Sequence, residues 1–338
     1  MHRLQYYWYR LSFLHALLLP LALLFALGTG VRRWLYLLRI LPGIRLPVPV
    51  IIIGNITAGG TGKTPLVIWL VDFLQQQGYR PGVISRGYGG SARTAQAVTP
   101  DRDAFIAGDE PVLLARLCSC PVWIGRDRVA AARGLLAAHP ECNVLISDDG
   151  LQHYRLRRDV EIAVVDGERV FGNGLPLPAG PLREMPWRLD RVDAVVINQD
   201  SETETRITEK PYSFPMRLRG DTFYNLLNPA HTVSAAEMRG KKLHALAGIG
   251  NPQRFFRHLQ TLGLSVEAHA FPDHHRYQAG DLRWPGAEAI LMTGKDAVKC
   301  EQLADENCWA LKIEAQLPPK FGERVLNKLK ARYGSQTA

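Results

Sequence analysis

Along most of the chain, short runs of apolar residues alternate with longer stretches in which apolar residues recur at helical spacing. Such short runs are typical of strands that are buried on both faces of a sheet. We predict strands at residues 50–53, 82–85, 144–147, 162–166 and 194–198, with helices at 65–77 and 109–117. This alternation predicts an α/β fold, in which a mostly parallel sheet carries helices on both faces.

The alternation weakens between residues 200 and 235, where a polar stretch is followed by Pro211 and Pro215. It then resumes, and we predict strands at 243–247, 265–270, 289–292 and 309–313 and a helix that begins near Pro252. The second half therefore predicts a smaller α/β domain, with an active site in the cleft between the two units. We divide the chain into an N-terminal helix (1–34), a first α/β domain (35–205), a connecting segment (206–238) and a C-terminal domain (239–338).

Residues 11–31 contain no Asp, Glu, Lys or Arg. A helix of this length reaches about 30 Å, close to the thickness of one bilayer core. The segment is flanked by aromatic and basic residues of the kind found at membrane interfaces, namely Tyr6, Tyr7, Trp8, Tyr9, Trp34 and Tyr36 with Arg3, Arg10, Arg32 and Arg33. We predict a membrane helix that spans the bilayer or lies in its interface, because cationic residues on both flanks leave the orientation open. A buried core helix and a cleaved signal peptide are the alternatives.

Composition narrows the class of partner. The chain of 338 residues has 41 Lys and Arg against 32 Asp and Glu, a net charge of +9. This balance favours anionic partners such as nucleic acid, acidic lipid or a phosphorylated substrate. The 5 cysteines include no C-x-x-C pair, which favours reduced thiols in a cytosolic setting.

The segment NITAGGTGKTP, residues 55–65, follows the first predicted strand and opens a predicted helix. It matches the phosphate-binding pattern G-x-x-x-x-G-K-[ST] except at Thr57, where the pattern has glycine. Its glycines allow successive backbone N–H groups to converge on a phosphate, Lys63 supplies a charge for the β- and γ-phosphates, and Thr64 supplies a hydroxyl for Mg²⁺. A P-loop NTPase-like first domain follows, although a glycine turn with a chance lysine is the alternative. The predicted nucleotide-binding residues are Thr57, Ala58, Gly59, Gly60, Thr61, Gly62, Lys63 and Thr64.

A pair of acidic residues follows another predicted strand. In SDDGLQH the strand ends in Asp148 and Asp149. A carboxylate at the end of a strand next to a phosphate loop is where Mg²⁺ is held in such folds. Consecutive residues of an extended chain point to opposite sides, so we assign Asp148 to the metal and Asp149 to the substrate, without an independent means of ranking them. A solvated acidic turn is the alternative.

Several segments together resemble the tetraacyldisaccharide 4'-kinase family, the inner-membrane kinases of lipid A biosynthesis. They are VPVIIIGNITAGGTGKTP, SRGYGG, GDEP, SDDGLQH, GNGLPLPAGPLRE, FPDHH and TGKDAVK, and they run in family order from about residue 48 to 299. The resemblance implies that ATP, with Mg²⁺, phosphorylates the 4'-hydroxyl of a tetraacylated glucosamine disaccharide 1-phosphate. It also implies a place at the cytoplasmic face of the bacterial inner membrane, against an anionic membrane surface. In the last segment the family often has an acid where this chain has Gly294, and Lys295 and Asp296 remain.

The resemblance also implies a catalytic pair. Asp109 in AGDEP and His274 in FPDHH match the family's acid and imidazole. A sugar hydroxyl is a weak nucleophile at neutral pH and benefits from a positioned base. Asp109 could instead cap a helix, and His275 could replace His274.

The remaining candidate residues lie in the same motifs. Glu184 and Arg183 end PAGPLRE and are candidates for a phosphate or sugar clamp, with a surface ion pair as the alternative. Arg128 is a candidate for neutralising the transferring phosphoryl group, or is a solvated helix arginine. The other predicted substrate residues, for which ordinary loop packing is the alternative, are Arg86, Tyr88, Gln152 and His153.

Three other functions would account for part of this pattern. A membrane-attached P-loop ATPase that drives transport or assembly would hydrolyse ATP without the lipid acceptor. A GTP-binding switch is disfavoured because no N-K-x-D base-reading tetrapeptide stands in the expected place. A nucleic-acid binder would account for the charge alone, but not for the apolar N-terminus or the strand-end acids. We therefore expect no nucleic acid among the partners.

Overall fold

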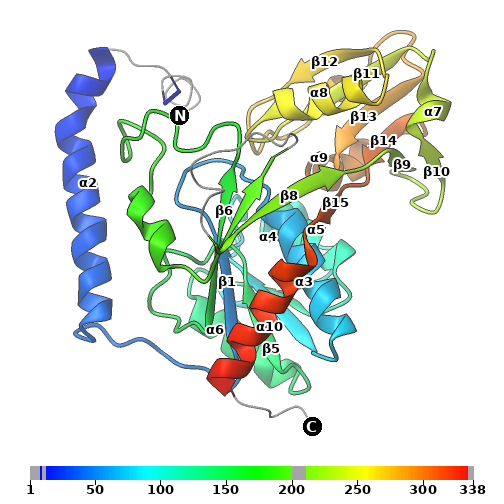
Figure 1. Cartoon of the computed structure of the whole chain (residues 1–338). Coiled ribbons are helices and arrows are strands. Elements are labelled where there is room, and N and C mark those ends of the chain that lie inside the picture. Colours follow the sequence, from blue (N-terminus) through cyan, green and yellow to red (C-terminus); the bar gives the residue numbers. More distant parts are fainter. Residues whose placement is uncertain (1–7, 10–12, 200–210, 334–338) are drawn as a thin grey trace.

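The computed structural model describes residues 8–9, 13–199 and 211–333. An N-terminal helix runs along one side of the molecule, at the left in Figure 1, and two sheets make up the rest. The first sheet lies centrally and the second at the upper right of that view.

The first sheet has nine strands in the order β15-β8-β7-β6-β1-β5-β2-β4-β3. All neighbours pair in parallel except β3 and β15, which lie antiparallel at the two edges. The predicted mostly parallel sheet is therefore confirmed. Its strands are β1 (Val50–Gly54), β2 (Pro81–Ser85), β3 (Gln96–Val98), β4 (Val122–Ile124), β5 (Val144–Ser147), β6 (Val160–Asp166), β7 (Ala194–Asn198), β8 (Ser213–Arg219) and β15 (Glu314–Gln316).

Apolar side chains of the central strand point alternately to two separate cores. Ile51 and Ile53 belong to the core on one face, and Val50 and Ile52 to the core on the other. The first core is covered by helices α3 (Lys63–Gln76), α5 (Asp109–Leu117) and α10 (Pro319–Tyr333), near which the short α4 (Ala104–Ala107) also lies. The second is covered by α6 (Arg128–Ala138) and the 3₁₀ helix η1 (Pro186–Arg191). Burial on both faces explains why these strands are apolar throughout.

The second sheet has six strands in the order β10-β9-β14-β13-β11-β12, of which β14, β13, β11 and β12 are parallel. The strands are β9 (Thr222–Asn225), β10 (Thr232–Ser234), β11 (Leu243–Ala247), β12 (Val266–Ala270), β13 (Ala289–Thr293) and β14 (Cys308–Leu311). The helices are α7 (Ala235–Met238), α8 (Pro252–Thr261), η2 (Ala279–Leu282), α9 (Gly294–Cys300) and η3 (Glu301–Leu303).

Every strand predicted from the pattern is present, with ends that differ by at most two residues. The short β3 and β4 were not predicted, because three residues carry too little periodicity. From the connecting segment, residues 206–210 lie outside the described part of the chain, and β8, β9, β10 and α7 follow. The domain boundaries stay predictions. Of the last two elements of the chain, β15 is an edge strand of the first sheet and α10 packs on its core.

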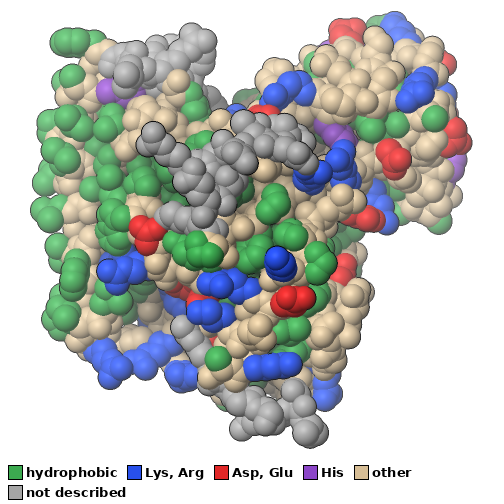
Figure 2. Space-filling view, viewed as in Figure 1, with side chains coloured by type: hydrophobic (Ala, Val, Ile, Leu, Met, Phe, Trp, Pro, Cys, Tyr) green, Lys and Arg blue, Asp and Glu red, His purple; other side chains and the backbone are tan. Residues whose placement is uncertain are grey.

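Helix α2 (Phe13–Leu37) carries the apolar N-terminal segment. Residues 15–37 are long and apolar enough to cross a membrane, and only 11% of the most apolar stretch is buried. The side chains of Phe13, Leu24 and Trp34 are 92%, 64% and 62% exposed, so α2 is not a buried core helix. Figure 2 shows hydrophobic side chains along this edge of the molecule. Tyr6, Tyr7, Arg3 and Arg10 lie outside the described residues.

Candidate active site

Most of the predicted site residues follow the carboxyl ends of three neighbouring strands. β5 lies between β1 and β2, and all three run in parallel. The loop 55–62 follows β1, residues 86–90 follow β2, and residues 148–153 follow β5. This is the edge at which open α/β sheets bind ligands.

The glycine loop has the backbone that a phosphate cradle requires. Gly59 and Gly62 adopt φ values of 109° and 88°, which side-chain-bearing residues avoid. A Cβ on Gly62 would also lie 2.3 Å from the side-chain nitrogen of Asn198. Thr57, the departure from the pattern, has no positive φ and forms an isolated β-bridge with Leu182. The loop therefore accommodates threonine by pairing with the PAGPLRE segment.

Lys63 and Asp149 meet beneath this loop. Nζ of Lys63 lies 3.3 Å from a carboxylate oxygen of Asp149 and donates to Oδ1 of Asn55 at 3.3 Å. Asp149 also accepts from Arg183, at 3.1 and 3.2 Å, and its φ is 48°. Burial alone would raise the pKa of Asp149, but the charges of Lys63 and Arg183 hold it well below its usual value. Asp149 is therefore a permanent anion between two cations.

Asp148 lies in a different environment, although it is the adjacent residue. Its side chain is buried and accepts from the Ser85 hydroxyl at 3.3 Å, while its Oδ1 has no hydrogen-bond partner among the described residues. Burial, followed by the charge of Glu110, raises the pKa of Asp148 to about 7. A buried carboxylate oxygen without a donor fits a hard divalent cation. Thr64 stands in the first turn of α3.

Arg128 is buried at the start of α6 and binds backbone rather than side chains. Its guanidinium donates to the carbonyl of Gly125 at 3.0 Å and to that of Asp148 at 3.2 Å. Burial lowers the pKa of Arg128 to about 10, so it stays charged at neutral pH. Arg128 is thus not a solvated helix arginine, and it holds the acidic turn after β5 in place.

Glu184 is the centre of a second network. It accepts from the side-chain amide of Gln152 at 2.7 Å and from the hydroxyl of Tyr154 at 2.5 Å, and Arg188 lies 3.4 Å away. Glu184 is therefore not one half of a surface pair with Arg183. Next to this network, burial lowers the pKa of His153 to about 4, so its imidazole is neutral at neutral pH.

Asp109 and His274 come together from the two halves of the chain. Nδ1 of His274 lies 3.0 Å from Oδ2 of the buried Asp109. Nζ of Lys295 lies 3.8 Å from the same oxygen, 3.2 Å from Glu110 and 3.3 Å from Asp273. Burial would raise the pKa of Asp109, but the hydrogen bond with His274 and the charge of Lys295 bring it below its usual value. The carboxyl is therefore ionised at neutral pH.

The neighbouring residues separate the two histidines of FPDHH. His275 turns to Asp281, at 3.2 Å, and stacks on Phe271. His274, with a φ of 60°, instead packs against the ring of Tyr88, with 5.1 Å between the ring centroids. The side chain of Arg86 is exposed, and its charge helps to lower the pKa of the buried Arg128.

Three residues that join these groups were given no role from sequence. They are Asn55, which binds Lys63, Tyr154, which binds Glu184, and Lys295, which binds three acids. Asn55 and Lys295 stand inside the motifs, whereas Tyr154 directly follows SDDGLQH. Their roles were missed because each acts through a side chain that the local pattern does not orient.

The two halves also meet backbone to backbone. A Cβ on Gly250, in the turn before α8, would lie 2.8 Å from the backbone nitrogen of Gly60. Arg169, from the first half, donates to the carbonyl of Gly250 at 2.8 Å. The glycine turn of the second half therefore lies directly against the phosphate-binding loop of the first.

A groove runs from helix α2 toward the charged network. On the helix side it is lined by Ala26, Thr29, Gly30 and Arg33, and on the other by Pro176, Arg183, Glu184, Met185 and Trp187. The guanidinium of Arg33 lies over the ring of Trp187, 4.7 Å from its centroid. One wall is thus formed by α2 and includes the cation of Arg33, and the other ends in the partners of Asp149 and Tyr154.

Comparison with known proteins shows which family this chain resembles over most of its length. A family model described as tetraacyldisaccharide-1-P 4'-kinase matches residues 14–330. A tetraacyldisaccharide 4'-kinase of Azoarcus sp. (strain BH72) is 52% identical over 93% of this chain and 91% of its own. One from Methylobacillus flagellatus is 48% identical over 96% and 95%. A crystal structure of LpxK from Aquifex aeolicus in complex with ATP is 31% identical, covers 94% of this chain and 99% of its own, and superposes with a TM-score of 0.80.

Proposed function

Because the chain belongs to the tetraacyldisaccharide-1-P 4'-kinase family, we propose that the cluster between its two sheets transfers the γ-phosphoryl group of ATP to the 4'-hydroxyl of a tetraacylated glucosamine disaccharide 1-phosphate. The observation that carries the assignment of this site is the groove described above. It connects an apolar helix, suited to acyl chains, with the ion network at the phosphate-binding loop.

The nucleotide occupies the loop of residues 57–64. Backbone N–H groups of the loop and Lys63 hold the phosphates, and the N-terminal end of α3 adds its positive dipole. Lys63 pairs with Asp149 in this structure, and when it moves away from Asp149 its ammonium group can bind the β- and γ-phosphates. Asp148 and Thr64 hold Mg²⁺, which when bound neutralises charge on those phosphates. The unpartnered oxygen of Asp148 supports its choice over Asp149.

The Asp109–His274 pair accepts the proton of the 4'-hydroxyl. As the hydroxyl oxygen attacks the γ-phosphorus, the bond from that phosphorus to the β–γ bridging oxygen breaks, ADP leaves, and the proton goes to the pair. An ionised Asp109 suits this task, since its carboxylate orients the imidazole at 3.0 Å. Lys295 holds Asp109, Glu110 and Asp273 together and acts as a positioning residue.

The acceptor lies in the groove, with its acyl chains along α2. Arg33 and Arg183 offer cations to an acceptor that already carries one phosphate, and Glu184 accepts hydrogen bonds from sugar hydroxyls. A tetraacylated lipid stays in the bilayer, so the exposed apolar surface of α2 meets that bilayer. Because ATP is supplied from the cytoplasm, the enzyme acts at the cytoplasmic face of the inner membrane, whose surface is anionic.

The test uses the full-length protein in detergent. Labelled ATP, Mg²⁺ and the acylated disaccharide monophosphate should yield a bisphosphorylated lipid, and Lys63→Ala should abolish it. Lys320→Ala, which removes an exposed lysine of α10, is the matched control and should retain activity. ATP hydrolysis that proceeds equally well without the lipid would instead indicate a membrane-attached ATPase.

A further inference from the structure

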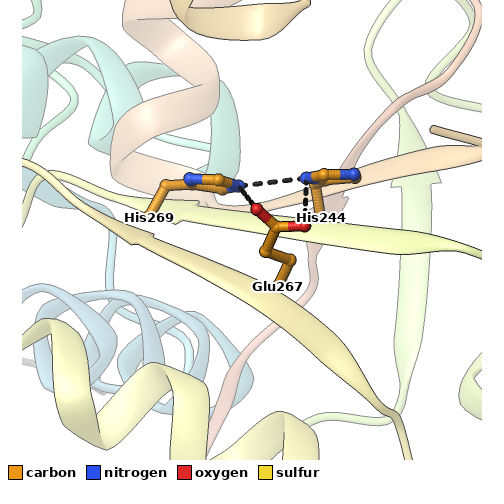
Figure 3. A group of neighbouring side chains, drawn as sticks. All are labelled: His244, Glu267 and His269. Carbon is orange, nitrogen blue, oxygen red and sulfur yellow. Dashed lines mark hydrogen bonds and ion pairs between the residues drawn. The ribbon is translucent and has the colours of Figure 1, made fainter. Parts of the chain in front are cut away.

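Three side chains of the types that bind metal ions in proteins lie together in the second sheet, away from the cluster around the phosphate loop. They are His244 on β11 and Glu267 and His269 on β12, and their ligand atoms all lie within 4.8 Å of one another. Figure 3 shows the two imidazoles edge to edge, with the carboxylate of Glu267 beside the gap between them.

The parallel register of β11 and β12 brings these side chains to one face. His244 and Glu267 are paired across the two strands, and Glu267 and His269 are two residues apart on β12. Residues two apart on a strand point to the same face of the sheet. β12 is an edge strand of the sheet. The cluster therefore lies at the edge of the sheet, where the side chain of Glu267 reaches solvent.

The distances suit a small ion. Nδ1 of His244 and Nε2 of His269 are 3.0 Å apart, and oxygens of Glu267 lie 3.8 Å from the first and 4.0 Å from the second. Two imidazoles on one tetrahedral Zn²⁺, at about 2.0–2.1 Å each, have nitrogens separated by about 3.4 Å. Small rotations of the rings would therefore separate the two nitrogens enough for a metal ion to take the place of the hydrogen bond between them.

The surroundings hold the rings in place and leave one side open. Trp284 stacks on His269 and on His244, with centroids 4.2 Å and 5.1 Å away and interplanar angles of 14° and 5°. The side chain of His244 is 5% exposed, and that of Glu267 is 66% exposed. An ion enters from the Glu267 side, where water completes its coordination.

We propose that His244, Glu267 and His269 form a binding site for one divalent transition-metal ion of the Zn²⁺ class. Two imidazoles and a carboxylate favour Zn²⁺, Ni²⁺ or Cu²⁺ over Mg²⁺, which prefers oxygen ligands. β12 leads into the loop that carries His274. An ion at this site ties the base of that loop to β11.

The test titrates the full-length, tag-free protein, stripped with a chelator, with ZnCl₂ by calorimetry. One ion is expected per chain, with a rise in the melting temperature. His269→Gln and Glu267→Gln, chosen because both side chains reach solvent, should each weaken binding at least about tenfold. His139→Gln removes an exposed histidine that also has a carboxylate, Glu141, at 3.2 Å, and should bind as the wild type does.

Co²⁺ provides a second readout that identifies the ligands. Nitrogen and oxygen ligands give only visible d–d bands, whereas thiolates of Cys118 or Cys120 would add a charge-transfer band in the near ultraviolet. The proposal is overturned by an absence of 1:1 binding at micromolar Zn²⁺, by unchanged binding in a folded His269→Gln variant, or by a thiolate band.

Discussion

At the scale of single residues, Asp148 and Asp149 are neighbours with opposite acid–base behaviour. Asp149 lies between Lys63 and Arg183, and its pKa is far below the usual value. Asp148 is buried beside Ser85, and its pKa is raised to about 7. The difference arises because Lys63 and Arg183 stabilise the carboxylate of Asp149 by direct ion pairs, whereas for Asp148 burial and the charge of Glu110 outweigh the cations nearby.

Asp148→Asn is expected to stabilise the metal-free protein at pH 8 by about 1–3 kcal/mol. Between pH about 4 and about 7 native Asp148 keeps a proton that the unfolded chain loses, so the wild-type free energy of unfolding falls as the pH rises through this window. Chemical denaturation in EDTA at pH 8 and pH 4 measures the effect. The gain should vanish at pH 4, and equal stability of variant and wild type at pH 8 would contradict the prediction. Kinase activity of the variant should be lost.

Lys295→Met is expected to move the acidic limb of the kcat/KM profile to higher pH. The charge of Lys295 helps to hold the pKa of Asp109 below its usual value, so its removal lets that pKa rise. A pH–rate series on the variant measures the shift. Lys312→Met removes an exposed lysine paired with Glu314 and should leave the limb in place; an unmoved limb in Lys295→Met would show that Lys295 does not act on the base.

At the scale of elements, α2 stands out because large apolar side chains cover its exposed surface. Leu17, Leu24 and Leu27 are 75%, 64% and 64% exposed, and they lie on a helix without acidic residues in its first turn. An apolar surface of this kind normally meets another apolar phase. The groove beside α2 is also lined by Arg183 and Glu184.

Leu24→Asp is expected to lower binding to anionic phospholipid vesicles by at least about tenfold, because a carboxylate is costly to transfer into hydrocarbon. Flotation of full-length protein with vesicles measures the bound fraction. Leu227→Asp makes the same change at a leucine that is 58% exposed in the second half of the chain and should bind normally. If both variants bind as the wild type does, α2 does not insert its apolar face.

At the scale of the whole molecule, the two halves are joined by charges and by a close backbone contact. Arg116 pairs with Glu301 at 2.5 Å, and Arg257 with Glu168 at 2.7 Å. Both pairs lie at the surface, where each contributes little by itself. The contact between Gly60 and Gly250 sets how closely the phosphate loop approaches the second half.

Gly250→Ala is expected to reduce kcat/KM about tenfold or more. The new Cβ would lie 2.8 Å from the backbone nitrogen of Gly60, so the halves must separate, and displacement by less than an ångström is costly to catalysis. Steady-state kinetics with ATP and the lipid acceptor measure the loss. Gly280→Ala, where an added Cβ meets no atom within 4 Å, is the matched control. Wild-type kinetics in Gly250→Ala would show that the contact opens at no cost.

The sequence alone determined the elements that depend on local periodicity and local backbone chemistry. The apolar runs predicted β1, β5, β6 and β7 of the first sheet and β11, β13 and β14 of the second, because strands buried on both faces consist almost entirely of apolar residues. The segment 55–65 predicted the phosphate loop for a similar reason, since only glycine adopts its left-handed turns freely.

Only the tertiary structure decided what depends on distant neighbours. It brought His274, and not His275, to Asp109 across 165 residues of sequence. It distinguished Asp148 from Asp149 by burial and by cations from helix α3 and from the PAGPLRE loop. It also placed Arg128 on backbone carbonyls and assembled His244 with Glu267 and His269. A pKa or a ligand set is a property of the surrounding space, and the local pattern of residues does not specify that space.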